Sequence, residues 1–141
     1  MENLGFSEIF INQYATGYAN EGKKTIACVI TKDYIPISKF KELFEMLSFE
    51  ILEGDFDKFV FDKTQLRTFH QPSMKWYFTE WKTEMFKHGL YKHFKVLPEL
   101  DYFRKAVEAA RKPLLAQYPK EMLAKLRIEY FETVKEAVEA E

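Results

Sequence analysis

The sequence has little of what marks several large classes of protein. Its 141 residues include a single cysteine, Cys28, so no internal disulfide can form. No uninterrupted apolar run approaches the ~18 residues that a membrane-spanning helix needs, and no signal peptide is recognisable. These absences predict a cytoplasmic protein in which Cys28 is a packing residue of a buried strand.

An excess of charge of one sign is also missing. The chain carries 21 basic and 22 acidic residues, a formal net charge of −1. Nonspecific nucleic-acid binding needs a strong positive field, so this balance argues against it. Residues 91–95 alternate basic and aromatic side chains, which could suggest RNA contact, but the charged start of a parallel strand gives the same pattern. We therefore expect no nucleic-acid partner.

Recognisable catalytic and metal-binding motifs are absent too. There is no Gly-rich phosphate loop, no Cys-x-x-Cys pair and no His-Glu-x-x-His. The three histidines, His70, His88 and His93, fall at no ligand spacing, and Ser73 lacks the Gly-x-Ser-x-Gly context of a serine nucleophile. The sequence therefore predicts no metal site, no cofactor and no enzymatic activity.

Apolar and aromatic side chains, by contrast, are abundant. Hydrophobic residues make up 47% of the chain and aromatic residues 17%, including 14 Phe and 8 Tyr. This is enough material for a dense core, which a disordered chain would lack. Because no linker, repeat or low-complexity tract interrupts the chain, residues 1–141 are predicted to form one domain.

The spacing of apolar residues predicts strands alternating with helices, and hence an α/β fold. Right-handed crossovers then give an open, mainly parallel sheet of about five strands, packed with helices. The first strand is expected to be antiparallel, because the link 16–23 reads as a hairpin turn. Pro113 should end or kink the third helix, and residues 114–125 could be a short helix after Pro119 or a mobile lid. The expected strands lie at 8–14, 24–31, 59–61, 90–97 and 126–131, and the expected helices at 37–47, 72–88, about 103–112 and about 134–138.

The central unit of the chain is a strand, a loop and a helix between Lys58 and Gly89. In the helix, which Pro72 opens, Trp76 points nearly opposite to the apolar stripe at ~100° per residue. That stripe consists of Met74, Tyr77, Phe78, Trp81 and Met85. We expect one core that combines Phe59, Val60, Phe61, Phe44, Trp81 and Val96.

The loop of this unit is the best candidate for a functional site. Ligands of parallel sheets bind outside the carboxyl ends of strands, and the free amides of a helix N-terminus favour an anion. Alternatively, these residues are structural: Gln71 or Ser73 caps the helix, Arg67 pairs with Asp62, and a neighbouring loop or the third helix covers Trp76. The candidate ligand- or partner-binding residues are Arg67, His70, Gln71, Ser73 and Trp76.

Several short stretches occur in an order that resembles a known family. Phe61-Asp62 is followed by Leu66-Arg67 and then by residues 76–81; Gly89-Leu90 precedes a strand, residues 96–98 end it, and residues 128–131 precede the last helix. The chain thereby resembles the STAS-like superfamily, specifically the bacterial SpoIIAA-like, STAS/CRAL-TRIO-related small proteins. The resemblance spans almost the whole chain and implies the open sheet described above.

The resemblance also implies a function. Anti-sigma-factor antagonists of this superfamily are switched by phosphorylation of a serine, whose place falls on Gln71 here. Ser73 is only a neighbour of that place, so the switch is expected to be absent. A non-enzymatic regulatory or interaction domain with a protein partner is therefore expected. Because related CRAL-TRIO proteins bind lipids, the alternative is a carrier or sensor of a small apolar or amphipathic ligand, with peripheral membrane contact and a homodimer both left open.

Overall fold

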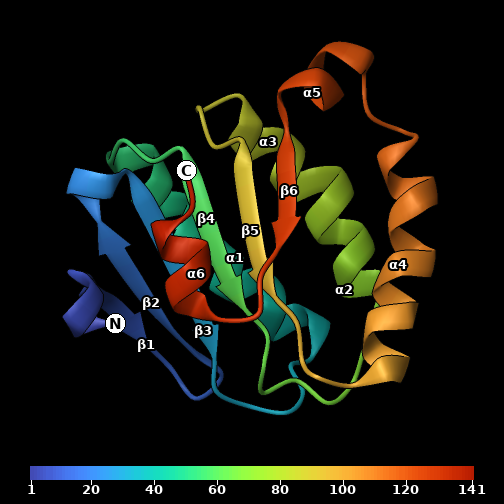
Figure 1. The fold of residues 1–141 in the computed structure, drawn as a ribbon, viewed down its shortest axis with the longest axis horizontal. Helices are drawn as coiled ribbons and strands as arrows, with labels where there is room; N and C mark the ends of the chain where they lie inside the picture. Colours follow the sequence, from blue (N-terminus) through green and yellow to red (C-terminus); the bar gives the residue numbers. More distant parts are fainter.

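A six-stranded sheet in chain order, from β1 to β6, forms the centre of the computed structural model, which describes residues 1–141 (Figure 1). The pairs β1–β2 and β2–β3 are antiparallel, whereas β3 to β6 are parallel neighbours. This arrangement confirms the predicted α/β class with an antiparallel first strand, and it adds a strand. The strands are β1 (Ser7–Ile11), β2 (Ala15–Asn20), β3 (Thr25–Ile30), β4 (Lys58–Asp62), β5 (Lys92–Val96) and β6 (Arg127–Tyr130).

The additional strand, β2, lies where the sequence predicted a turn. Gly17 gave the link its turn-like composition, but in the structure Phe10 of β1 packs directly over this glycine. A Cβ atom at position 17 would lie 2.3 Å from the Phe10 ring. The prediction was therefore wrong because the glycine meets the packing needs of another strand. The actual turn is the short 3-10 helix Glu21–Lys23, in which the Asn20 side chain accepts a hydrogen bond from the Lys23 amide.

Most helices cover one face of the sheet, whereas α6 and the N-terminal 3-10 helix η1 (Glu2–Leu4) pack on the other (Figure 1). The segments α2, η3 and α3 follow one another without a break and form one rod. Helix α4 runs two residues past Pro113 instead of ending there. The helices are α1 (Ile37–Glu53), α2 (Gln71–Trp76), the π-helical η3 (Tyr77–Trp81), α3 (Lys82–Phe86), α4 (Asp101–Leu115), α5 (Lys120–Lys125) and α6 (Val134–Glu139).

The apolar interior consists of two separate clusters, one on each face of the sheet. The larger contains Phe44, the Phe59 and Phe61 rings of β4, and Trp81. Val60 and Val96 belong instead to the smaller cluster beneath α6. The expectation of one core was therefore wrong for these two valines, because successive strand residues point to opposite faces. The predicted helical stripe, from Met74 to Met85, is buried as expected.

The buried lysine Lys58 fixes α6 on the smaller cluster. Its Nζ donates hydrogen bonds to the carbonyl oxygens of Ala137 (3.0 Å), Val138 (2.8 Å) and Ala140 (2.8 Å), at the carboxyl end of α6. A cation placed there satisfies carbonyls that have no partner within the helix.

Replacing this lysine should detach or loosen α6. We expect Lys58→Met to lower the free energy of unfolding by roughly 2–4 kcal/mol, because several charge-assisted hydrogen bonds are lost together. Urea unfolding followed by circular dichroism measures the change. Lys92→Met, at the paired position of β5, is the control and should change stability much less. Equal losses in the two variants would show that the capping bonds are not responsible.

Candidate ligand site at the ends of the parallel strands

The loop between β4 and α2 is held by its own side chains. Asp62 Oδ1 accepts hydrogen bonds from the Thr64 amide (3.0 Å) and the Thr64 hydroxyl (2.8 Å). Arg67 Nη1 donates to the carbonyl oxygens of Thr64 (2.8 Å) and Leu66 (2.9 Å). The exposed Arg67 side chain therefore supports the loop, and it does not pair with Asp62.

His70 is the capping residue of α2. Its Nδ1 accepts a hydrogen bond from the Ser73 amide at 3.3 Å and lies 2.8 Å from the Ser73 hydroxyl oxygen. The sequence proposed Gln71 or Ser73 for this role, but Gln71 is exposed and Ser73 is buried against the cap. A histidine ring that accepts from a backbone amide leaves only its other nitrogen free to meet a ligand.

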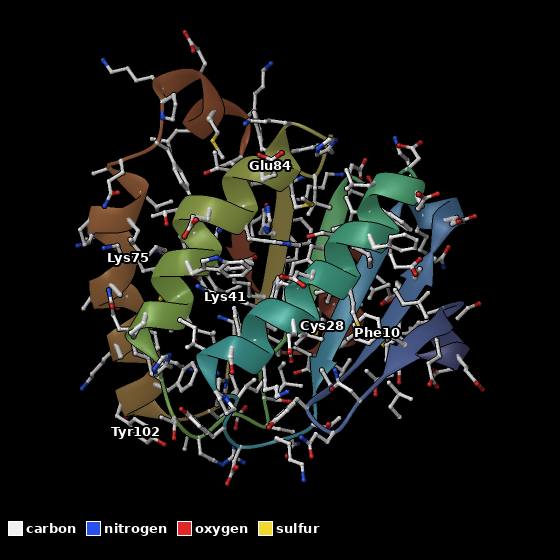
Figure 2. All side chains as sticks on the ribbon, turned by 180° about the vertical axis from the view of Figure 1, so that it is seen from behind. Phe10, Cys28, Lys41, Lys75, Glu84 and Tyr102 are labelled. Carbon is white, nitrogen blue, oxygen red and sulfur yellow. The ribbon has the colours of Figure 1, made fainter.

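Trp76 is covered by α1, whereas the sequence suggested a neighbouring loop or the third helix as its cover. Its ring meets Phe40 and Phe44 edge-on, with centroids 6.1 and 6.0 Å apart. Lys41 of α1 places its Nζ 5.7 Å from the Trp76 ring, and Figure 2 shows this lysine beside the rod. Trp76 therefore contributes to packing between two helices while it keeps a partly exposed edge.

Two of the five candidates, His70 and Ser73, line a small cavity at the carboxyl end of β4. The cavity has a volume of ≈ 50 Å³, enough for a few water molecules or a small ligand group. Its wall is mainly apolar and includes Phe61, Phe69 and Phe103. Arg67, Gln71 and Trp76 do not line it. The site predicted from sequence thus separates into a cavity and an outer surface.

The wall also contains a buried lysine, Lys63, just after β4. Its side chain is buried, its Nζ lies 4.9 Å from the Phe61 ring centroid, and no carboxylate lines the cavity. Burial lowers the pKa of this amine from 10.5 to about 8. An apolar cavity that holds an amine and no acid is complementary to an acidic group on an apolar body.

Sequence reasoning missed a second group of basic side chains beneath the helices. Lys82, His93 and Lys95 are almost wholly buried, and the Tyr77 hydroxyl lies 2.8 Å from His93 Nδ1. Burial lowers the pKa of His93 well below its usual value. Residues 91–95 had been interpreted as a charged strand start, yet Lys95 lies at the far end of β5. The only sequence signal was that positions 93 and 95 share one face of the strand.

The amines of Lys82 and Lys95 form a pair enclosed by aromatic rings. Lys82 Nζ lies 3.6 Å from the Phe78 ring centroid and 4.9 Å from that of Tyr77; for Lys95 Nζ the distances are 4.3 and 4.6 Å. Both amines thus lie against the same two rings, and neither forms a salt bridge. Burial, reinforced by the neighbouring cations, lowers the pKa of both amines well below 10.5.

Comparison with known proteins identifies no relative of this chain. No family model matches it, and no match is found among curated proteins or among solved structures. None of the helices combines the length and the apolar character needed to cross a membrane. No group of three or more His, Cys, Asp and Glu side chains is arranged to hold a metal ion. The cavity and the buried amines are therefore the features from which a function can be inferred.

Proposed function

We propose that this protein is a non-enzymatic, STAS-like regulatory domain that senses or carries a small amphipathic anion. The ligand binds in the cavity at the carboxyl end of β4. The observation that carries the proposal is the burial of Lys63 in an apolar cavity wall without any acidic partner. A bound carboxylate would supply that partner, and the surrounding rings would hold its apolar end.

The size of the cavity restricts the ligand. A volume of ≈ 50 Å³ suits a short-chain carboxylate and excludes an aryl acid or a full-length lipid chain unless the walls move. The edge-on ring pair of Phe69 and Phe103, with centroids 5.8 Å apart, connects the loop to α4 on one side of this space. Ligand entry could therefore be communicated to α4, which would make the domain a sensor.

A regulatory role through serine phosphorylation has less support than ligand binding. Gln71 occupies the place of the family's phosphorylated serine, and the hydroxyl of the neighbouring Ser73 is buried against His70. A kinase would have to open the start of α2 to reach it. An interaction with a protein partner through the outer surface, around Arg67 and Trp76, is the second candidate, because both side chains keep exposed surface.

A ligand screen distinguishes the two candidates. Saturation-transfer NMR against short-chain carboxylates, each paired with its uncharged amide, should detect binding of acids and not of amides. Lys63→Met should weaken binding of the best acid at least tenfold, because a charge-assisted contact is worth about 1.5 kcal/mol or more.

The matched control is Arg67→Ala, which changes an exposed cation of the same loop outside the cavity. It should leave the affinity unchanged. Lys63→Met is expected to fold, because an unpaired buried amine is replaced by an apolar side chain. If Arg67→Ala abolishes binding and Lys63→Met does not, the site is the outer surface. If no acid binds, the cavity has no such function.

A further inference from the structure

We propose that a second cavity, between α4 and the carboxyl end of β6, binds a free α-amino acid with an apolar side chain. The carboxylate of this ligand meets Arg111 and Tyr130, and its ammonium group meets Glu108. The cavity lies apart from the one that contains Lys63, and no residue lines both. The second site is therefore independent of the proposed function.

The position of this cavity follows from the topology of the sheet. Leu97 comes directly after β5 and Tyr130 ends β6, so the cavity opens at the carboxyl ends of two parallel strands. Ligands of open α/β sheets bind at such ends. Another wall is one face of α4, which Figure 1 shows on the β6 side of the sheet. The cavity has a volume of ≈ 340 Å³, within the range of about 300–1,000 Å³ that is typical of small-molecule sites.

Arg111 and Tyr130 present hydrogen-bond donors that have no acceptor within the protein. The Arg111 Nε and the Tyr130 hydroxyl are buried and unpaired, and Arg111 takes part in no ion pair. The guanidinium carbon lies 5.3 Å from the centroid of the Tyr130 ring, so the two side chains lie against each other in the cavity wall. A guanidinium with free donors binds a carboxylate through two parallel hydrogen bonds. These two side chains therefore suit the carboxylate end of a ligand.

The other charged side chains of the cavity mostly have partners within the protein. Arg104 Nη2 lies 4.0 Å from Glu132 Oε2, and Arg104 Nε donates a hydrogen bond to the carbonyl oxygen of Pro98 at 2.9 Å. Glu136 Oε1 accepts a hydrogen bond of 3.2 Å from the Thr133 hydroxyl at the start of α6. The acidic residues also oppose a ligand that carries only negative charge.

Glu108 is the carboxylate of the cavity without such a partner. It takes part in no ion pair, although Arg111 lies three residues later on the same face of α4. Opposite charges at this spacing are close enough to pair on a helix. Two unpaired charges of opposite sign, about one helical turn apart, are complementary to a ligand that carries an ammonium group and a carboxylate on one carbon. Because Glu108 is exposed, the ammonium group would lie at the mouth of the cavity and the carboxylate deeper, beside the buried donors.

Apolar side chains determine which amino acid fits. Leu97, Val107 and Phe131 line the cavity, and Val107 is buried while the other two are half-buried. An aliphatic or thioether side chain gains by covering these surfaces, whereas a polar one would lose its hydration without gaining a partner. The expected ligands are therefore valine, leucine, isoleucine or methionine as free amino acids. In a longer peptide the amine and the carboxylate belong to different residues and could not both be bound here.

A titration followed by two-dimensional ¹⁵N–¹H NMR tests the site with these four amino acids. We expect saturable binding, with the largest shifts at the amides of residues 104–111 and 128–132. For leucine, 3-methylbutylamine lacks the carboxylate and 4-methylpentanoate lacks the ammonium group. Each analogue should bind at these amides about tenfold more weakly or worse, because one charged contact is lost. The site is refuted if no amino acid shifts these amides, or if either analogue binds there as tightly as leucine.

Variants of the wall test the assigned contacts in the same titration. Arg111→Met should weaken leucine binding by about tenfold or more, and Glu108→Gln and Tyr130→Phe should weaken it several-fold. The matched control is Lys112→Met, which alters an exposed lysine of the same helix outside the cavity and should leave the affinity unchanged. Circular dichroism checks that each variant is folded. Unchanged affinity in folded Arg111→Met would overturn the assignment.

Two further comparisons separate the two cavities and fix the orientation of the ligand. Lys63→Met should leave leucine binding unchanged; a loss in this variant, with binding retained in Arg111→Met, would place leucine in the cavity at the end of β4 and refute the second site. Arg111→Met should not further weaken 3-methylbutylamine, and Glu108→Gln should not further weaken 4-methylpentanoate, because each analogue already lacks the group concerned. The opposite pattern would contradict the roles given to Arg111 and Glu108.

Discussion

The free energy of unfolding should fall steeply as the pH is lowered from 8 to 6.5. Burial lowers the pKa of the Lys82 and Lys95 amines well below 10.5 in the folded state, so we expect both to be neutral over this range, whereas in the unfolded chain both are protonated. The unfolded state therefore binds more protons, and stability rises with pH. Each such amine contributes about 1.4 kcal/mol per pH unit, so the pair should give a slope of roughly 2–3 kcal/mol per pH unit.

Other buried groups with shifted pKa values change the free energy of unfolding mainly outside this pH range. The pKa values of Lys58 and Lys63 are lowered to about 8, so these two lysines make the stability depend on pH mainly above pH 8. The pKa of His93 is lowered from about 6.5, so this histidine affects the stability only below about pH 6.5. Burial raises the pKa of Cys28, which reduces stability only at higher pH, where the unfolded thiol ionises.

Urea unfolding at several pH values measures the slope directly. Lys95→Met should remove about half of it, whereas Lys75→Met should leave it unchanged, because Lys75 is exposed. A flat profile in the wild type between pH 6.5 and 8 would mean that the two amines are charged in the folded protein. In that case a bound anion, and not an amine pair, would occupy the space between them.

The alternation of strands and helices was predictable because their apolar spacing reflects local contact with the sheet. Phe40, Leu43, Phe44 and Leu47 of α1 occur at helical spacing, and all are buried. The strand β2 was not predictable in this way, because its glycine is explained only by Phe10, a residue of another strand. Likewise, Val60 and Val96 could be recognised as buried, but not as members of a different cluster from Phe59.

The candidate site was predictable only in part. The rule that ligands bind at the ends of parallel strands pointed to the loop after β4, and two of its predicted residues, His70 and Ser73, do line a cavity there. It could not reveal Lys63 as part of a cavity, because the wall includes Phe103, from a helix about forty residues later. The amine pair was missed for another reason: lysines are almost never fully buried unless paired, so a single sequence favours placing Lys82 and Lys95 at the surface.

Removal of the Trp81 side chain should be one of the most destabilising single changes in the larger cluster. Its ring stacks on Tyr77 with centroids 5.5 Å apart and meets Phe44 edge-on at 4.7 Å. Its Nε1 donates a hydrogen bond to the Ser48 hydroxyl at 2.8 Å. Trp81→Ala should lower the free energy of unfolding by roughly 3–5 kcal/mol, since it leaves a cavity where helix α1, the rod and β4 meet.

Two further variants separate packing from hydrogen bonding at this position. Trp81→Phe keeps most of the ring contact and loses the bond to Ser48, so a loss of about 1–2 kcal/mol is expected. Phe49→Ala, on the exposed side of α1 where the ring is 62% accessible, should change stability by less than about 0.5 kcal/mol. Urea unfolding followed by far-ultraviolet circular dichroism gives all three values. If Trp81→Ala were no more destabilising than Phe49→Ala, the rod could not pack on α1 through this ring.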